Sequence, residues 1–229
     1  MKLIVILTLG LLFSCSKSGK FNSQGLDISL PGEISTLDPA NCYDTVCYVA
    51  VTQVYESLYE FEYLKRPYAL RPLLAEGAPI VSDDRLTYTI KIKKGIKYHD
   101  SKHIPVGRDV KAQDFINQIK RLAFLPTRSQ GWWLFDGRIK GLNEWRSIVG
   151  TDLEKFFTTK VEGLEAIDDH TLVIKLKEPY PQLQFALTMN FTSPMPEEAI
   201  KATKNDFMNE AVGTGAYFIT RYHHAQEVI

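Results

Sequence analysis

The chain has 229 residues, and 45% of them are hydrophobic, so it is long enough to bury a core and to hold one or two domains. Its 27 basic residues balance 27 acidic ones, and this lack of a basic excess argues against a nucleic-acid partner. After the first residues, the sequence contains no apolar run of the length that a membrane-spanning helix needs. The composition therefore predicts a globular body.

The first residues have the pattern of a secretory signal. Lys2 precedes an apolar stretch from Leu3 to Phe13, which is too short for a spanning helix. A buried N-terminal strand is the alternative, but the polar run at residues 16–20 disfavours it. We therefore expect a signal over residues 1–15, a flexible tether over residues 16–25 and a folded body over residues 26–229, located outside the cytoplasm.

Three local patterns follow the tether. The alternation from Leu26 to Leu30 predicts a first strand. Pro39 forces Asp38 out of the helical region, so the chain is expected to turn there. Apolar residues at steps of three and four predict a helix over Tyr43–Tyr59, and Asp44 suits the N-terminal end of its dipole.

Cys42 and Cys47 flank the start of this helix. In an oxidising compartment they could close a small loop, but residues five apart on one helix point to different sides. A disulfide therefore requires Cys42 to lie before the helix begins, and the sequence leaves a bridge and free thiols equally open. Two thiols without a nearby histidine are a weak indication of metal, and we predict no metal site and no cofactor.

The next stretch changes its hydrophobic period. Strict alternation over Leu86–Ile92 predicts a half-buried strand after a polar turn at Asp83–Arg85. A short second strand is expected at Ile96–Tyr98. Apolar residues at helical spacing over Ala112–Leu122 predict an amphipathic helix. Strands followed by a helix indicate a mixed α/β or α+β fold.

Trp132 and Trp133 are adjacent, so they cannot both face one core from a regular helix or strand. We expect at least one of them at a cleft wall or a domain seam, where an indole can stack on a ligand and donate its N–H. The alternative is that both cap the local core on an irregular turn.

The last third repeats an earlier pattern. Asp168-Asp169 introduces a second alternating strand over Leu172–Leu176, which we expect to share a sheet with Leu86–Ile92. Gln182–Met189 is expected to form a short helix. The glycines at 213 and 215 allow a tight turn into a strand, but the third glycine and following helix of a dinucleotide fingerprint are missing.

Several of these segments resemble family 5 of the bacterial extracellular solute-binding proteins, the oligopeptide, dipeptide and nickel receptors of ABC importers. The similar segments are Leu37–Pro39 (LDP), Val54–Tyr59 (VYESLY), Tyr68–Glu76, Leu73–Leu122, Val161–Pro181 and Val212–Tyr217 (VGTGAY). Ser57 and Ala216 depart from the family's usual Gly and Pro. The resemblance covers nearly all of residues 26–229, but it matches only the N-terminal half of the family.

The resemblance implies a lobe of the type II periplasmic binding fold, with mixed sheets and flanking helices, whose second lobe is missing from this sequence. It implies a monomeric, non-enzymatic receptor that captures peptides or similar small solutes and delivers them to the permease subunits of an ABC transporter. By their place in the chain, Tyr43, Asp44, Trp132 and Trp133 are the ligand-binding candidates.

Residues Leu12 to Cys15 resemble a lipobox, in which the cysteine becomes lipidated. The resemblance implies that Cys15 carries the lipid and anchors the protein to a membrane of the cell envelope, with its body in the periplasm. Phe13 departs from the motif, so a plain cleaved signal is the alternative.

Two other interpretations compete with a receptor. The first is a truncated or decayed product that binds little, because the resemblance ends halfway through the family. The second is a secreted, lipid-anchored hydrolase, but His99-Asp100 lacks a placed nucleophile and we identify no catalytic residue. No P-loop is present, so the ATPase of any transporter must be another chain.

Overall fold

The computed structural model describes residues 28–224 and 226–229. The predicted signal, Cys15 and the tether lie outside these residues, as does the first part of the strand predicted at Leu26–Leu30. Its described part, residues 28–30, is not a strand. The chain divides between Pro31 and Gly32 into two units, and all of the described helices and strands lie in the second unit, Gly32–Ile229.

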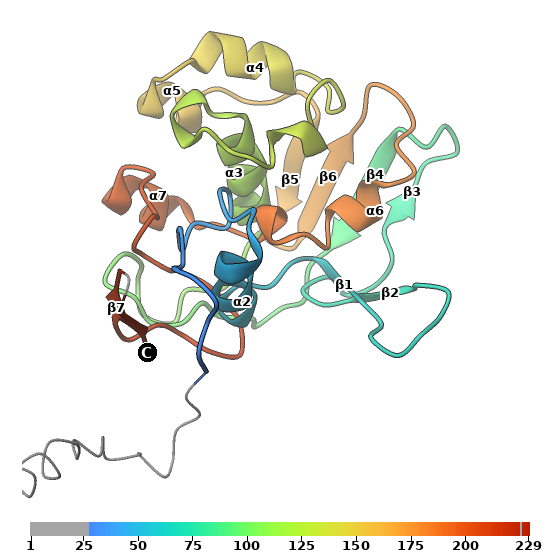
Figure 1. The fold of residues 1–229 in the computed structure, drawn as a ribbon. Coiled ribbons are helices and arrows are strands. Elements are labelled where there is room, and N and C mark those ends of the chain that lie inside the picture. Colours follow the sequence, from blue (N-terminus) through green and yellow to red (C-terminus); the bar gives the residue numbers. More distant parts are fainter. Residues whose placement is uncertain (1–27, 225) are drawn as a thin grey trace, which may run out of the picture. The chain divides into compact units, whose positions relative to one another are not determined.

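A four-stranded antiparallel sheet organises the second unit (Figure 1). Its strands, in spatial order, are β3 (Ile80–Val81), β4 (Thr87–Lys91), β6 (Thr171–Lys175) and β5 (Leu164–Asp168). β4 and β6 pair directly, with Tyr88 opposite Ile174 and Ile90 opposite Leu172. The prediction that the two strands introduced by Asp-Asp turns share one sheet is confirmed.

The alternation predicted for Leu86–Ile92 is also confirmed. Tyr88, Ile90 and Ile92 are buried, whereas Lys91 is exposed. The second strand predicted at Ile96–Tyr98 is wrong, because this segment makes only an isolated bridge between Lys97 and Asp109.

The helix predicted at Ala112–Leu122 is present as α3 (Ala112–Ala123). It contacts β5 and β6 on one side and two short helices, α4 (Leu142–Val149) and η4 (Asn190–Thr192), elsewhere. α3 is amphipathic in its residue pattern, as predicted, but it is covered on several sides, so its polar residues Asn117, Gln118 and Lys120 are buried as well. Each of these three side chains is hydrogen-bonded, as most buried polar groups are; the Gln118 amide, for example, donates to the Phe191 carbonyl at 2.8 Å.

The remaining elements are short and surround the sheet and α3 (Figure 1). Two small sheets pair β1 with β2 and β7 with β8. These elements are α2 (Thr45–Val54), β1 (Tyr59–Phe61), β2 (Leu70–Pro72), η2 (Leu125–Thr127), η3 (Trp132–Leu134), α5 (Leu153–Thr158), α6 (Leu183–Ala186), α7 (Glu197–Thr203), β7 (Tyr222–His223) and β8 (Glu227–Val228).

Two predicted helices are shorter in the structure. The helix expected over Tyr43–Tyr59 is α2, which ends at Val54, and Tyr59 already begins β1. The helix expected over Gln182–Met189 is a single turn, α6. Tertiary contacts end α2, because the backbone N–H groups of Gly215 and Tyr217 donate to the carbonyls of Val54 and Gln53 at 2.8 and 3.0 Å.

This contact also changes the interpretation of the glycines. No strand follows Gly215 directly, because the next strand along the chain is β7, so that expectation is wrong. A Cβ atom at Gly213 or Gly215 would instead overlap the carbonyl oxygens at the end of α2. The two glycines are needed for this close approach of one backbone to another.

Candidate functional site

A buried ion pair holds the segment that leads into α2. The chain turns at Pro39 as predicted, and the Asp38 carboxylate accepts a hydrogen bond from the Ala40 N–H at 2.9 Å. The same carboxylate accepts bonds from both Nη atoms of Arg121 on α3, at 2.7 and 3.1 Å. Arg121 is fully buried and Asp38 nearly so. The ion pair therefore connects this turn to the central helix.

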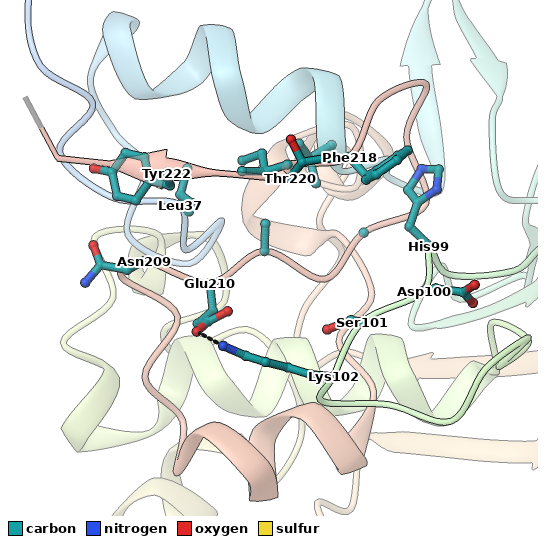
Figure 2. Close-up of a pocket in the computed structure, with 14 residues that line it drawn as sticks. Leu37, His99, Asp100, Ser101, Lys102, Asn209, Glu210, Phe218, Thr220 and Tyr222 are labelled. Atoms are coloured by element: carbon teal, nitrogen blue, oxygen red, sulfur yellow. Dashed lines mark hydrogen bonds and ion pairs between the residues drawn. The ribbon is translucent and has the colours of Figure 1, made fainter. Parts of the chain in front are cut away.

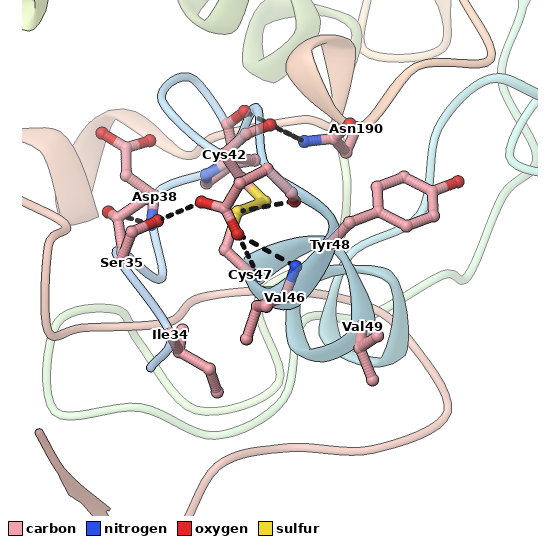
Figure 3. Close-up of a disulfide and its surroundings, with 12 residues drawn as sticks. Ile34, Ser35, Asp38, Cys42, Val46, Cys47, Tyr48, Val49 and Asn190 are labelled. Carbon is pink, nitrogen blue, oxygen red and sulfur yellow. Dashed lines mark hydrogen bonds between the residues drawn. A yellow bond between two sulfur atoms is a disulfide. The ribbon is translucent and has the colours of Figure 1, made fainter. Parts of the chain in front are cut away.

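A disulfide between Cys42 and Cys47 closes a short loop directly after this turn (Figure 3). The sulfur atoms of Cys42 and Cys47 are joined, and the Cα atoms are 5.8 Å apart. α2 begins at Thr45, so Cys42 lies before the helix, which is the condition that the sequence set for a bridge. The amide of Asn190 donates to the Cys42 carbonyl at 3.2 Å and attaches this small loop to η4.

Asp44 lies inside the loop and caps α2. Its Oδ1 accepts hydrogen bonds from the backbone N–H groups of Val46 and Cys47, both at 2.9 Å, and Oδ2 accepts one from the Ser35 hydroxyl at 2.6 Å. The Ser35 hydroxyl and these two N–H groups hold the pKa of Asp44 below its ordinary value. Oδ1 therefore caps the helix, while Oδ2 is bonded to Ser35.

A hollow of about 300 Å³ opens beside this loop. Three of its side chains are exposed aromatic ones, with exposed fractions of 62% for Tyr43, 54% for Tyr48 and 51% for Trp133. The Tyr43 ring lies 6.1 Å from the ring of Phe191 at the base. The complete lining is Cys42, Tyr43, Asp44, Thr45, Tyr48, Trp133, Met189, Asn190 and Phe191. No lysine, arginine or histidine is among these residues, so the hollow is aromatic and without a cationic group.

The structure thus brings together three of the four residues predicted as ligand-binding candidates. The neighbours Tyr43 and Asp44 line one hollow with Trp133, which is far from them in sequence. Trp132 does not line it, because the two indoles leave the 3-10 helix η3 in different directions. The Trp132 ring instead lies under the guanidinium group of Arg146, 5.0 Å from the ring centroid.

The residues on the other side of the hollow were not predicted from the sequence. Tyr48 belongs to α2. Cys47 and Val51 lie on the buried face of this helix, whereas Tyr48 lies on its exposed face. Met189, Asn190 and Phe191 come from the segment after α6, which no pattern in the sequence assigned to a site. Their position depends on long-range contacts such as the one between Asn190 and Cys42.

A second hollow of about 310 Å³ lies at the other end of α2 (Figure 2). It is polar and contains His99, Asp100 and the ion pair of Lys102 with Glu210 at 2.7 Å. His99 Nε2 lies 2.6 Å from the Gly215 carbonyl oxygen. The His99 ring is thus engaged with a backbone carbonyl group.

The described part of the chain holds neither a cluster of metal ligands nor a membrane-spanning helix. Across residues 28–224 and 226–229, no group of three or more His, Cys, Asp or Glu side chains could hold a metal ion. Within the same residues, no helix is both long and apolar enough to cross a membrane.

Comparisons with known proteins give the chain's relatives. It is 32% identical over 213 residues to the oligopeptide-binding protein AmiA of Streptococcus pneumoniae, and the alignment covers 89% of this chain and 29% of AmiA. It is 27% identical to the glutathione-binding protein GsiB of Escherichia coli, over 93% of this chain and 35% of GsiB. Among solved structures, the pheromone receptor PrgZ superposes on this chain with a TM-score of 0.69 and 28% identity, over 84% of this chain and 35% of PrgZ. That structure describes the mode of peptide binding of PrgZ.

The chain therefore spans about a third of the length of the relatives that it matches. The fold seen here corresponds to a portion of oligopeptide-binding protein structures. The model of the bacterial extracellular solute-binding proteins, family 5, middle part, matches residues 69–229, which is more than half of the chain. The chain belongs to family 5 of the bacterial extracellular solute-binding proteins.

Proposed function

We propose that this chain is the N-terminal part of the substrate-binding component of an ABC importer, which captures peptides or similar small solutes without chemical change. AmiA binds oligopeptides and GsiB binds glutathione, as their names state, so a peptide-like ligand is the chemistry that the two relatives share. The observation that supports a ligand site in this chain is the hollow lined by Tyr43, Asp44 and Trp133.

The chemistry of this hollow suits an apolar or aromatic side chain of a peptide. Tyr43, Tyr48 and Trp133 offer exposed ring faces on which such a group can stack, and Phe191 closes the base. Both oxygens of the exposed Asp44 carboxylate already accept hydrogen bonds, so Asp44 offers a ligand ammonium group its charge and little remaining hydrogen-bonding capacity. The free carbonyl oxygen of the Asn190 side chain can accept a hydrogen bond from a ligand N–H.

In this proposal the chain supplies one lobe of a type II periplasmic binding fold, and residues outside this sequence supply the second lobe. Closure of two lobes over the hollow would exclude water from the bound side chain and present the closed form to permease subunits. We propose that the body acts as a monomer in the periplasm or at the cell surface, anchored through a lipid on Cys15. Mass spectrometry of protein made with its signal tests the anchor, because Cys15→Ser should abolish an added lipid mass.

Calorimetric titration of the mature chain with a pool of di- to pentapeptides tests the function, together with mass spectrometry of the peptides afterwards. The proposal predicts heat of binding and intact peptides. Cleaved peptides would support the hydrolase instead. A protein that is folded by circular dichroism but gives no heat would support the interpretation of this chain as a fragment that binds little.

A further inference from the structure

The hairpin formed by β1 and β2 carries an exposed apolar tip that the proposed function does not use. Tyr63 and Leu64 lie in its loop with exposed fractions of 87% and 90%, the two highest among the exposed large hydrophobic side chains of the described residues. Behind them, Phe61 and Tyr68 on the hairpin and Phe185 on α6 form a half-exposed aromatic cluster. The Phe61 ring lies 5.9 Å from that of Tyr68 and 6.0 Å from that of Phe185.

The loop that presents this tip is well held. The Glu62 N–H donates to the Ala69 carbonyl at 2.8 Å, and the Lys65 N–H donates to the Glu62 carbonyl at 3.1 Å. The guanidinium group of Arg66 donates to the carbonyls of Tyr63 and Lys65 at 3.1 and 2.8 Å. The loop is thus closed by its own hydrogen bonds while its two apolar side chains point outward, and their exposure is a defined feature of the loop.

The charges of the hairpin leave one cation at the tip. Glu60 pairs with Arg71 at 2.9 Å, and Glu62 pairs with Lys65 at 3.6 Å. Arg66 lies over the Tyr68 ring, 4.4 Å from its centroid, and no carboxylate of the described residues forms an ion pair with it. The tip therefore presents tyrosine, leucine and an uncompensated guanidinium group side by side.

We propose that this hairpin tip inserts into a lipid surface that contains anionic headgroups. Tyrosine and arginine suit the interface because each has an apolar body with a polar end, and Leu64 can enter the acyl region. Arg66 then meets the negative headgroups. The tip is a projecting loop of a few residues, whereas a stable interface with a second copy or another protein needs roughly 20–30 residues on each side.

A weak contact of this kind is sufficient for a tethered protein. If Cys15 carries a lipid as proposed, the chain from residue 16 to residue 31 spans at most about 3.6 Å per residue, so the body stays within a few tens of ångströms of the membrane. The lipid contact does not depend on the proposed ligand site, because Tyr63 and Leu64 do not line that hollow.

Vesicle co-sedimentation of the mature chain from residue 16, made without an acyl group, tests the proposal. The vesicles contain phosphatidylcholine alone or phosphatidylcholine with phosphatidylglycerol. We expect binding to the anionic vesicles, a fall in binding at high salt, and a partition coefficient lower by about tenfold in the double variant Tyr63→Ser/Leu64→Ser. Val106→Ser is the matched control, because Val106 is 84% exposed on a different loop.

A dye that responds to polarity supplies a second measurement. Attached at Leu64→Cys it should shift to the blue on anionic vesicles, and attached at Val106→Cys it should not. Absence of vesicle binding, binding that ignores phosphatidylglycerol, or equal binding by the double variant would overturn the proposal. Peptide titration of the double variant should match that of the wild type, so a failure here is distinct from a failure of the proposed function.

Discussion

Asp38 and Arg121 form a buried bidentate ion pair that joins the turn before α2 to the central helix α3. Arg121 is held further by the side chains of Asn205 and Gln118, at 2.6 and 3.0 Å, and its guanidinium group lies 4.5 Å from the centroid of the Phe207 ring. The segment that carries Cys42 to Thr45 follows this turn directly. The position of the aromatic hollow therefore depends on an ion pair that does not line it.

Removing one partner of this pair should leave an uncompensated buried charge. We expect Asp38→Asn and Arg121→Met each to lower the free energy of unfolding by about 3–5 kcal/mol, measured by urea denaturation. The double variant should cost less than the sum of the two, because no charge is left buried. Lys97→Met is a control, since its ion pair with Asp109 is exposed and should be worth less than about 1 kcal/mol. Additive effects of the two buried substitutions would contradict the coupling.

Gly213 and Gly215 approach the end of α2 so closely that we expect the fold to be destabilised by a methyl side chain at either position. Gly213→Ala and Gly215→Ala should each reduce the free energy of unfolding by about 2 kcal/mol, because the carbonyls of Val54 and Gln53 must move away. At Gly77 nothing lies within 4 Å of the added atom, so Gly77→Ala should change stability by less than about 0.5 kcal/mol. Equal effects at the three positions, measured by thermal or urea unfolding, would argue against the contact.

The disulfide should stabilise the fold modestly, because it closes only a short loop. The chain-entropy relation gives about 2 kcal/mol for a loop of this length, to be lost in Cys42→Ser/Cys47→Ser. Urea unfolding with and without a dithiol reductant measures it: the reductant should destabilise the wild type and leave the double variant unchanged. Two titratable free thiols in the native, oxidised protein would show that the bridge does not form.

Lys120 should make stability depend on alkaline pH. Its side chain is nearly fully buried between the faces of Trp145 and Phe156, and burial lowers its pKa from 10.5 to about 8. Below pH 8 both the folded and the unfolded states are protonated at this group. Between pH 8 and 10.5 the unfolded state binds more protons, so the free energy of unfolding should rise with pH, by about 3 kcal/mol over the whole window.

The comparison with Lys120→Met isolates this effect from the other lysines and tyrosines that titrate in the same range. We expect the wild type to gain stability relative to the variant as the pH is raised from 7 towards 10. Parallel curves for the two proteins would show that the hydrogen bonds from Lys120 to the carbonyls of Phe156 and Thr159 keep its pKa near the ordinary value.

The parts of the fold that rest on local periodicity could be predicted. The strand at Leu86–Ile92, its partner at Leu172–Leu176 and the helix α3 all follow from the alternation or helical spacing of their own residues. The C-terminal end of α2 and the segment after Gly215 could not be predicted, because they are determined by hydrogen bonds between residues more than 150 positions apart. Helical spacing also gave no sign that Asn117 and Lys120 would be buried, since that depends on what covers α3.

The candidate site, like the fold, was predicted only in part from the sequence. Place in the chain alone singled out Tyr43, Asp44, Trp132 and Trp133, and the structure gathers all of them except Trp132 in one hollow. Their role in ligand binding stays a prediction. The role of Asp44 was predicted only in part. Its place near the start of the helix followed from the sequence, but the hydrogen bond that its second carboxylate oxygen accepts from Ser35 did not. Trp132 and Trp133 could not be told apart by sequence, because their directions depend on the irregular helix η3 and on Arg146.

The most direct measurement of the central claim compares these two neighbouring tryptophans in calorimetric titrations with an apolar tetrapeptide taken from the pool. We expect Trp133→Ala to weaken binding by about tenfold, since an aromatic stacking contact and its buried area are lost. Trp132→Ala, adjacent in sequence but outside the hollow, should bind within about twofold of the wild type once its folded state has been verified by circular dichroism. Undiminished binding by Trp133→Ala would contradict the assignment of the hollow as the ligand site.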